Sequence, residues 1–139
     1  MKSITSFLVK FALVATVLTI IFRYCLSYGI ENQTVVIIVL SAVLYSIGMF
    51  IFGWHFGKKD GNYLPIYDVG FRFHATTYLI HNAISELWFV FGFNSGYEKI
   101  EMIHLQAMIW GFFLLCHLLF FLKAKKKSIN GLNKTELFE

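Results

Sequence analysis

The segment Phe71–Phe93, FRFHATTYLIHNAISELWFVFGF, combines the length of a membrane span with the side chains of a polar site. It exceeds the roughly 20 residues that cross about 30 Å of hydrocarbon. At about 100° per residue, His74, His81 and Ser85 fall on one face of a helix, with Asn82 and Glu86 along its edge. Because ionisable groups are costly in hydrocarbon, we expect this face to be a functional site turned away from lipid.

The composition of the whole chain is that of an integral membrane protein. Of the 139 residues, 58% are hydrophobic and 14% are charged, whereas a soluble domain has about 25% charged residues. The segments between the apolar runs are shorter than the roughly 50 residues that a separate domain needs. The formal net charge of +4 fits the basic cytoplasmic flanks of membrane spans. We therefore expect the lipid bilayer, and not nucleic acid, as a partner.

Four apolar segments predict an all-α fold, an integral membrane four-helix bundle. The first segment continues without a small-residue cleavage site, so we expect it to be retained as a span. The stretch 57–70, GKKDGNYLPIYDVG, contains the only proline and predicts a loop. We expect a transmembrane domain at residues 1–122, with spans at about 6–28, 34–56, 71–93 and 102–122, and a disordered basic cytoplasmic tail at 123–139.

The distribution of basic residues predicts the orientation of the chain. All lysines and arginines except Arg23 and Lys99 fall at one end of the four predicted spans. Since short loops rich in Lys and Arg stay cytoplasmic, we expect both termini in the cytoplasm. Size and architecture alone are those of small bacterial membrane effectors, an analogy that suggests a multi-pass protein of the inner (cytoplasmic) membrane of a bacterium.

A second polar stripe is predicted on the first span, where Ala12, Thr16, Thr19 and Arg23 follow i, i+4, i+7 and i+11 spacing. At about 1.5 Å per residue, Arg23 and Glu86 reach similar heights, and we predict an ion pair between them. The alternatives are a pair that only fixes helix register, or an Arg23 that extends to the interface. The full candidate site, as a closed polar network or as one wall of a water-filled path, comprises Arg23, His74, His81, Asn82, Ser85, Glu86, Gln106 and His117.

Three functions remain open from the sequence. The leading hypothesis is a homo-oligomeric channel or pore-like effector, in which rings of Glu86 and His81 favour cations and respond to pH. The second is an accessory or assembly subunit that binds a membrane protein partner. The third is a haem- or metal-binding redox protein, with His117 facing His81 or His74 across the cofactor.

Catalytic and metal-binding motifs are absent from the sequence. It contains no GxSxG, P-loop or paired-carboxylate motif, and Ser85 beside His81 has no evident oxyanion donor. It also lacks the HExxH spacing, and ExxH occurs once, at Glu101 and His104, whereas a di-iron bundle site uses two such motifs. We therefore expect a protein that is not an enzyme and that carries no cofactor unless the haem hypothesis holds.

Overall fold

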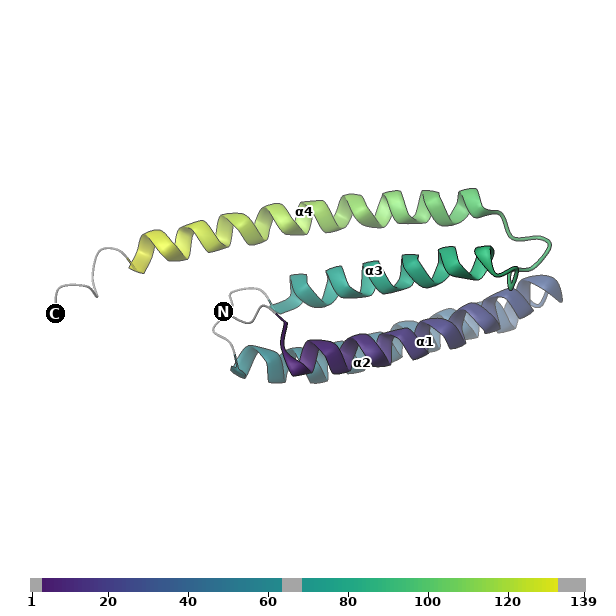
Figure 1. Ribbon diagram of the computed structural model, residues 1–139, viewed down its shortest axis with the longest axis horizontal. Coiled ribbons are helices and arrows are strands. Elements are labelled where there is room, and N and C mark those ends of the chain that lie inside the picture. Colours follow the sequence, from purple (N-terminus) through teal and green to yellow (C-terminus); the bar gives the residue numbers. More distant parts are fainter. Residues whose placement is uncertain (1–3, 64–68, 133–139) are drawn as a thin grey trace.

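The computed structural model describes residues 4–63 and 69–132, and in these residues the chain is all-helical. Its four helices are α1 (Ser6–Glu31), α2 (Val35–Tyr63), α3 (Val69–Val90) and α4 (Ile100–Leu132). Figure 1 shows α1 and α3 running in one direction and α2 and α4 in the other, so the start of α1 and the end of α4 lie at the same end. The predicted all-α class is confirmed.

Three of the four helices are long and apolar enough to cross a membrane. They are α1, α2 as far as Gly61, and α4 as far as Lys123. The remaining helix, α3, is 22 residues long and carries the polar residues of the candidate site, which lower its mean hydropathy. The membrane crossing of α3 and the cytoplasmic location of both termini stay predictions.

The helices form an open arrangement and not a closed bundle. The first two helices pack closely as a hairpin, α3 lies along α1 and also touches α2, and α4 lies along α3. Within the described residues, α4 packs against neither α1 nor α2. The third helix therefore lies between the α1–α2 hairpin and α4 (Figure 1), while one side of the fourth helix is left uncovered.

A single line of residues buries α1 against its neighbours. Thr16, which the sequence places on the buried stripe, is only half-buried and donates a hydrogen bond to the Ala12 carbonyl of its own helix. The buried line is apolar near the start of α1 and polar near its end, and its members, four residues apart, are Phe11, Ala15, Thr19, Arg23 and Ser27.

The helix α2 continues through the region predicted as a loop, and a buried carboxylate explains why. Asp60 is fully buried, accepts a hydrogen bond from the Thr5 hydroxyl and pairs with Arg72 at 3.1 Å. Thr5 is also the N-cap of α1. These contacts tie the end of α2 to the starts of α1 and α3. The loop prediction for 57–70 is thus wrong for 57–63 and 69–70, and residues 64–68 lie outside the described part.

The helix α4 also extends beyond its predicted end at residue 122. It continues to Leu132, so the prediction of a disordered tail is wrong for residues 123–132. Lysine and alanine are strong helix formers, and the stretch that follows Leu122, KAKKK, consists of these residues. Residues 133–139 lie outside the described part of the chain.

The outward faces of α2 and α4 are apolar over most of their length. On α2 the exposed side chains include Val36, Leu40 and Phe50, and on α4 they include Phe112 and Phe120. Apolar patches on soluble monomers rarely exceed a few hundred Å². Continuous outward apolar faces of this kind fit contact with lipid tails.

Candidate functional site

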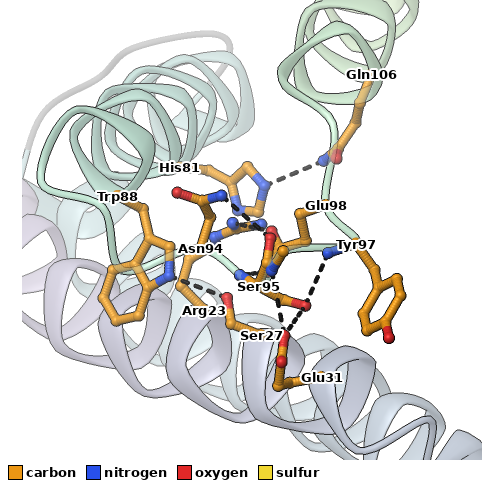
Figure 2. Close-up of polar contacts among 11 residues, drawn as sticks. Arg23, Ser27, Glu31, His81, Trp88, Asn94, Ser95, Tyr97, Glu98 and Gln106 are labelled. Carbon is orange, nitrogen blue, oxygen red and sulfur yellow. Dashed lines mark hydrogen bonds and ion pairs between the residues drawn. The ribbon is translucent and has the colours of Figure 1, made fainter.

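The partner of Arg23 is Glu98, which lies in the connection between α3 and α4. The two side chains are 2% and 6% exposed, and Nη2 lies 2.5 Å from Oε2 (Figure 2). The predicted pair of Arg23 with Glu86 is wrong. Glu86 pairs instead with His104 of α4 at 3.0 Å, where both side chains are about half exposed. Ser85, and not its neighbour Glu86, lies on the buried face of α3, because successive helical residues are about 100° apart.

The connection between α3 and α4 is held in place by hydrogen bonds to its own backbone and to α1. The Ser95 hydroxyl donates to Glu31 at 2.6 Å, and the Gly96 N–H donates to the same carboxylate at 3.1 Å. Within the connection, Glu98 accepts a bond from the Ser95 N–H and Ser95 Oγ accepts one from the Tyr97 N–H. These bonds close a compact turn ahead of α4, which begins at Ile100. The spacing Ser-x-x-Glu at positions 95 and 98 was the sequence signal that could have identified this segment.

A tryptophan adds a further polar contact between α3 and α1 at this end. The indole N–H of Trp88 donates to Ser27 Oγ at 3.0 Å (Figure 2). Ser27 is the last polar member of the buried line of α1. The end of α3 is thereby fixed to α1 beside the Arg23 ion pair.

A second polar network, centred on His81, draws one side chain from each helix. Gln106 Nε2 donates to His81 Nε2 at 3.0 Å, and His81 Nδ1 lies 3.2 Å from the Tyr45 hydroxyl. The Tyr45 hydroxyl lies 3.2 Å from Thr19 Oγ1, which donates to the Ala15 carbonyl at 2.7 Å. An amide nitrogen only donates and a carbonyl only accepts. The hydrogen bonds can therefore all point the same way, with each group donating to the next from Gln106 through His81, Tyr45 and Thr19 to the Ala15 carbonyl.

This network closes within one chain, and it includes a residue that the sequence interpretation had not assigned to the site. Tyr45 lies on α2, from which the sequence predicted no site residue, and its phenol reaches His81 of α3. Its ring also stacks on Phe22 of α1 at 4.6 Å between centroids. The polar side of α3 is therefore satisfied largely by the neighbouring helices of the same chain.

The remaining predicted site residues lie apart from these two networks. Asn82 donates to the Tyr78 carbonyl of its own helix at 2.7 Å. Ser85 is fully buried, and within the described residues its hydroxyl has no hydrogen-bond partner. His74 lies beside His117, with 3.2 Å between their Nδ1 atoms. The structure thus divides the predicted set into several small groups.

Of the two histidine pairs proposed for haem, the structure brings together only one. His74 and His117 are neighbours, whereas the ring nitrogens of His81 lie beside Tyr45 and Gln106. Among the described residues there is no group of three or more His, Cys, Asp or Glu side chains arranged to hold a metal. Haem binding stays a prediction.

Between α1 and α4 lies a groove of about 790 Å³, open along one side because α4 packs only on α3 in the described part of the chain. Polar side chains from both networks line it at one level, with Arg23 and Glu98 next to His81 and Gln106. The rest of its lining is mainly apolar and includes Phe22, Leu26 and Ile30 from α1 and Met102, Ile109, Trp110 and Phe113 from α4.

Comparisons with models of known protein families, with curated proteins and with solved structures found no significant match. The chemistry of the groove is therefore the main guide to function.

The ion pair that lines the groove is balanced in charge but retains one unused donor, and the exposed Lys99 lines the groove as well. The charge of Arg23 is matched by Glu98. The Nε–H of Arg23 is buried, and no described residue accepts a hydrogen bond from it. An unsatisfied buried donor costs about 1–3 kcal/mol. The ion pair therefore contains a buried donor without an acceptor among the described residues, in a side chain that lines the groove.

Proposed function

We propose that this is a multi-pass membrane protein that binds a membrane-soluble amphiphile in the groove between α1 and α4. The apolar tail lies between the two helices, and an acceptor oxygen of the head group takes the hydrogen bond from Arg23 Nε. The observation that carries this proposal is a buried N–H group, without an acceptor among the described residues, in a side chain that lines a groove with mainly apolar walls.

The proposal includes α3 as a fourth membrane-spanning helix. Its 22 residues extend about 33 Å at 1.5 Å per residue, enough to cross the hydrocarbon layer. His81 and Ser85 are buried against the other helices, which removes much of the cost of placing them in a membrane. Lys58, Lys59 and Lys123 lie at one end of the helices and support a cytoplasmic location for that end.

The balanced charge of the Arg23–Glu98 pair favours an uncharged head group at Arg23, although the exposed Lys99 also lines the groove. Because Glu98 already neutralises Arg23, an anionic head would place a second negative charge beside a buried carboxylate. A carbonyl oxygen supplies the acceptor without that cost. Phe22 and Trp110 line the groove and offer aromatic faces to a planar or unsaturated ligand. Quinones and diacylglycerols share this chemistry, and both are soluble in the bilayer.

The pore-like function stays a prediction with weaker support. A pore wall formed by several copies requires the polar face of α3 to be directed out of the single chain. Instead, His81 and Ser85 are buried inside it, while Glu86 remains about half exposed. A homo-oligomer, a membrane protein partner and the absence of enzymatic activity likewise stay predictions.

Native mass spectrometry of the purified full-length protein in detergent tests the proposal with three probes: a short-chain quinone, a dioctanoylglycerol and a short-chain phosphatidylglycerol. We expect one of the two uncharged probes to bind, and the phosphatidylglycerol to bind more weakly. Binding of quinone alone or of diacylglycerol alone identifies the ligand class. Preferential binding of phosphatidylglycerol contradicts the uncharged head group, and binding of none of the probes contradicts the proposal.

Arg23→Lys is the decisive variant, because lysine keeps the positive charge beside Glu98 and lacks the guanidinium Nε–H. We expect roughly a tenfold or greater loss of affinity, as for the loss of one hydrogen bond to a charged group. Leu26→Trp fills the groove and should abolish binding. Met108→Leu, on the exposed face of α4, is the matched control and should bind normally. Equal affinities in all three variants would place the ligand elsewhere.

A further inference from the structure

A pair of histidines joins α3 and α4 at the end of the molecule away from the Arg23 ion pair. The Nδ1 atoms of His74 and His117 lie 3.2 Å apart, and their ring planes are inclined by 62°. The ring of Phe71 packs edge-on against His117 and stacks on Phe121. The position of the His117 ring is therefore fixed by its aromatic neighbours as well as by His74.

The separation of the two nitrogens matches shared coordination of a metal ion. Two imidazole nitrogens at about 2.0–2.1 Å from a tetrahedral zinc ion lie roughly 3.3–3.4 Å from each other. The observed distance of 3.2 Å differs from this by only a few tenths of an ångström. Axial ligands of haem, in contrast, lie on opposite sides of the iron, so this close approach suits a small ion better.

We propose that His74 and His117 bind a zinc-like divalent transition-metal ion between α3 and α4. Imidazole is a preferred ligand of zinc, copper and nickel. Among the described residues no third His, Cys, Asp or Glu joins the pair. His74 is exposed and lies near the start of α3, and His117 is half-buried and lies six residues before Lys123, so both are close to the basic end of the helices.

A metal at this position would stabilise the least supported helix of the fold. Within the described residues α4 packs on α3 alone. The connection containing Glu98 fixes the beginning of α4 to α1, and a bridge between His74 and His117 would fix its later part to α3. The ion would thus set the distance of α4 from the rest of the molecule. This inference does not depend on a ligand in the groove.

Metal binding can be measured on tag-free full-length protein in detergent. After incubation with Zn²⁺ and desalting, we expect a stoichiometric amount of zinc by elemental analysis and a higher Tm, because an ion that binds only the folded state stabilises it. With Co²⁺ as the probe, we expect visible absorption bands from a low-coordinate site. Absence of retained zinc and of the Co²⁺ spectrum would mean that the pair forms only a hydrogen bond.

Histidine variants locate the site. His74→Gln and His117→Gln should each lose zinc retention and the Zn²⁺-induced rise in Tm. His55→Gln and His104→Gln, at other positions on α2 and α4, should keep both. If either test variant fails to fold, protection of wild-type histidines from diethylpyrocarbonate by Zn²⁺ gives the same information, and protection should be confined to peptides containing His74 and His117. Unchanged zinc binding in the two variants, or protection of other histidines only, would overturn the proposal.

Discussion

The two ends of α1 are buried in different ways. Near its start, Phe11 and Ala15 pack against Phe73 of α3 in a small apolar core that borders a second groove, of about 620 Å³. Near its end, Arg23 and Ser27 are buried against Trp88 and the connection that follows α3, while α4 stands away. Where helices are in contact, apolar side chains hold them together. Where they separate, a polar connection covers the helix end and leaves a groove.

Each end also contains a buried carboxylate paired with an arginine, and the two pairs have different consequences. Asp60 accepts from Thr5 and from Arg72, and so joins the ends of three helices. Glu98 pairs with Arg23 and joins one helix to a connection. The second arrangement leaves the Arg23 Nε–H without an acceptor among the described residues. We call the contacts of Asp60 with Thr5 and Arg72 the clasp, because they hold three helix ends together. The other end instead retains the unused N–H group of Arg23.

The largest effect is expected when Glu98 is changed to glutamine. Glu98→Gln leaves the buried charge of Arg23 without a counter-charge, and breaking a buried pair in this way costs about 3–5 kcal/mol. The measurement is the free energy of unfolding in mixed detergent micelles. Glu101→Gln, at an exposed position two residues into α4, is the control and should change little.

A double variant separates the loss of attraction from the burial of an unpaired charge. Arg23→Met combined with Glu98→Leu removes both charges and should be less destabilising than the sum of the single changes. A cost below about 1 kcal/mol for Glu98→Gln would match an exposed pair and would contradict the difference between the two ends.

At the clasp end, Asp60→Asn should have a smaller effect. Asparagine keeps a carbonyl oxygen that can accept the bond from Thr5, and Arg72 is 15% exposed, so water can partly solvate its charge. We expect a loss of about 1.5–3 kcal/mol, the range for a hydrogen bond to a charged group. The same unfolding measurement applies, with Lys59→Gln as the neighbouring exposed control. A loss greater than that of Glu98→Gln would reverse the comparison and make the clasp the main electrostatic support.

Periodicity was sufficient to predict the helices and part of the buried face of α3, since both follow from residue spacing. His81 and Ser85 are buried, whereas His74, which the sequence places on the same face, is exposed. The partner of Arg23 could not be obtained in the same way. Counting residues gives the height of a side chain along its helix, but not how each helix is rotated about its own axis relative to its neighbours. In addition, Glu98 lies in the connection between α3 and α4, where a helical count does not apply.

The open position of α4 was also beyond the sequence pattern. Four apolar segments of similar length predict four helices, but their outer faces are too alike to show which pairs are in contact. The same limit applies to the predicted loop after α2. Its glycines and proline favoured a turn, whereas the buried contacts of Asp60 with Thr5 and Arg72 depend on residues distant in sequence.

The smallest effect is expected for the pair of Glu86 with His104. It lies outside both buried ends, and its side chains are 45% and 56% exposed. Exposed ion pairs contribute about 0.2–1 kcal/mol, so Glu86→Gln and His104→Gln should each lower the free energy of unfolding by less than about 1 kcal/mol. A loss as large as that of Asp60→Asn would require Glu86 to be buried under the conditions of the measurement. Since the single chain leaves it exposed, the missing cover would have to come from another copy or a partner, and repeating the measurement at several protein concentrations would show whether association supplies it.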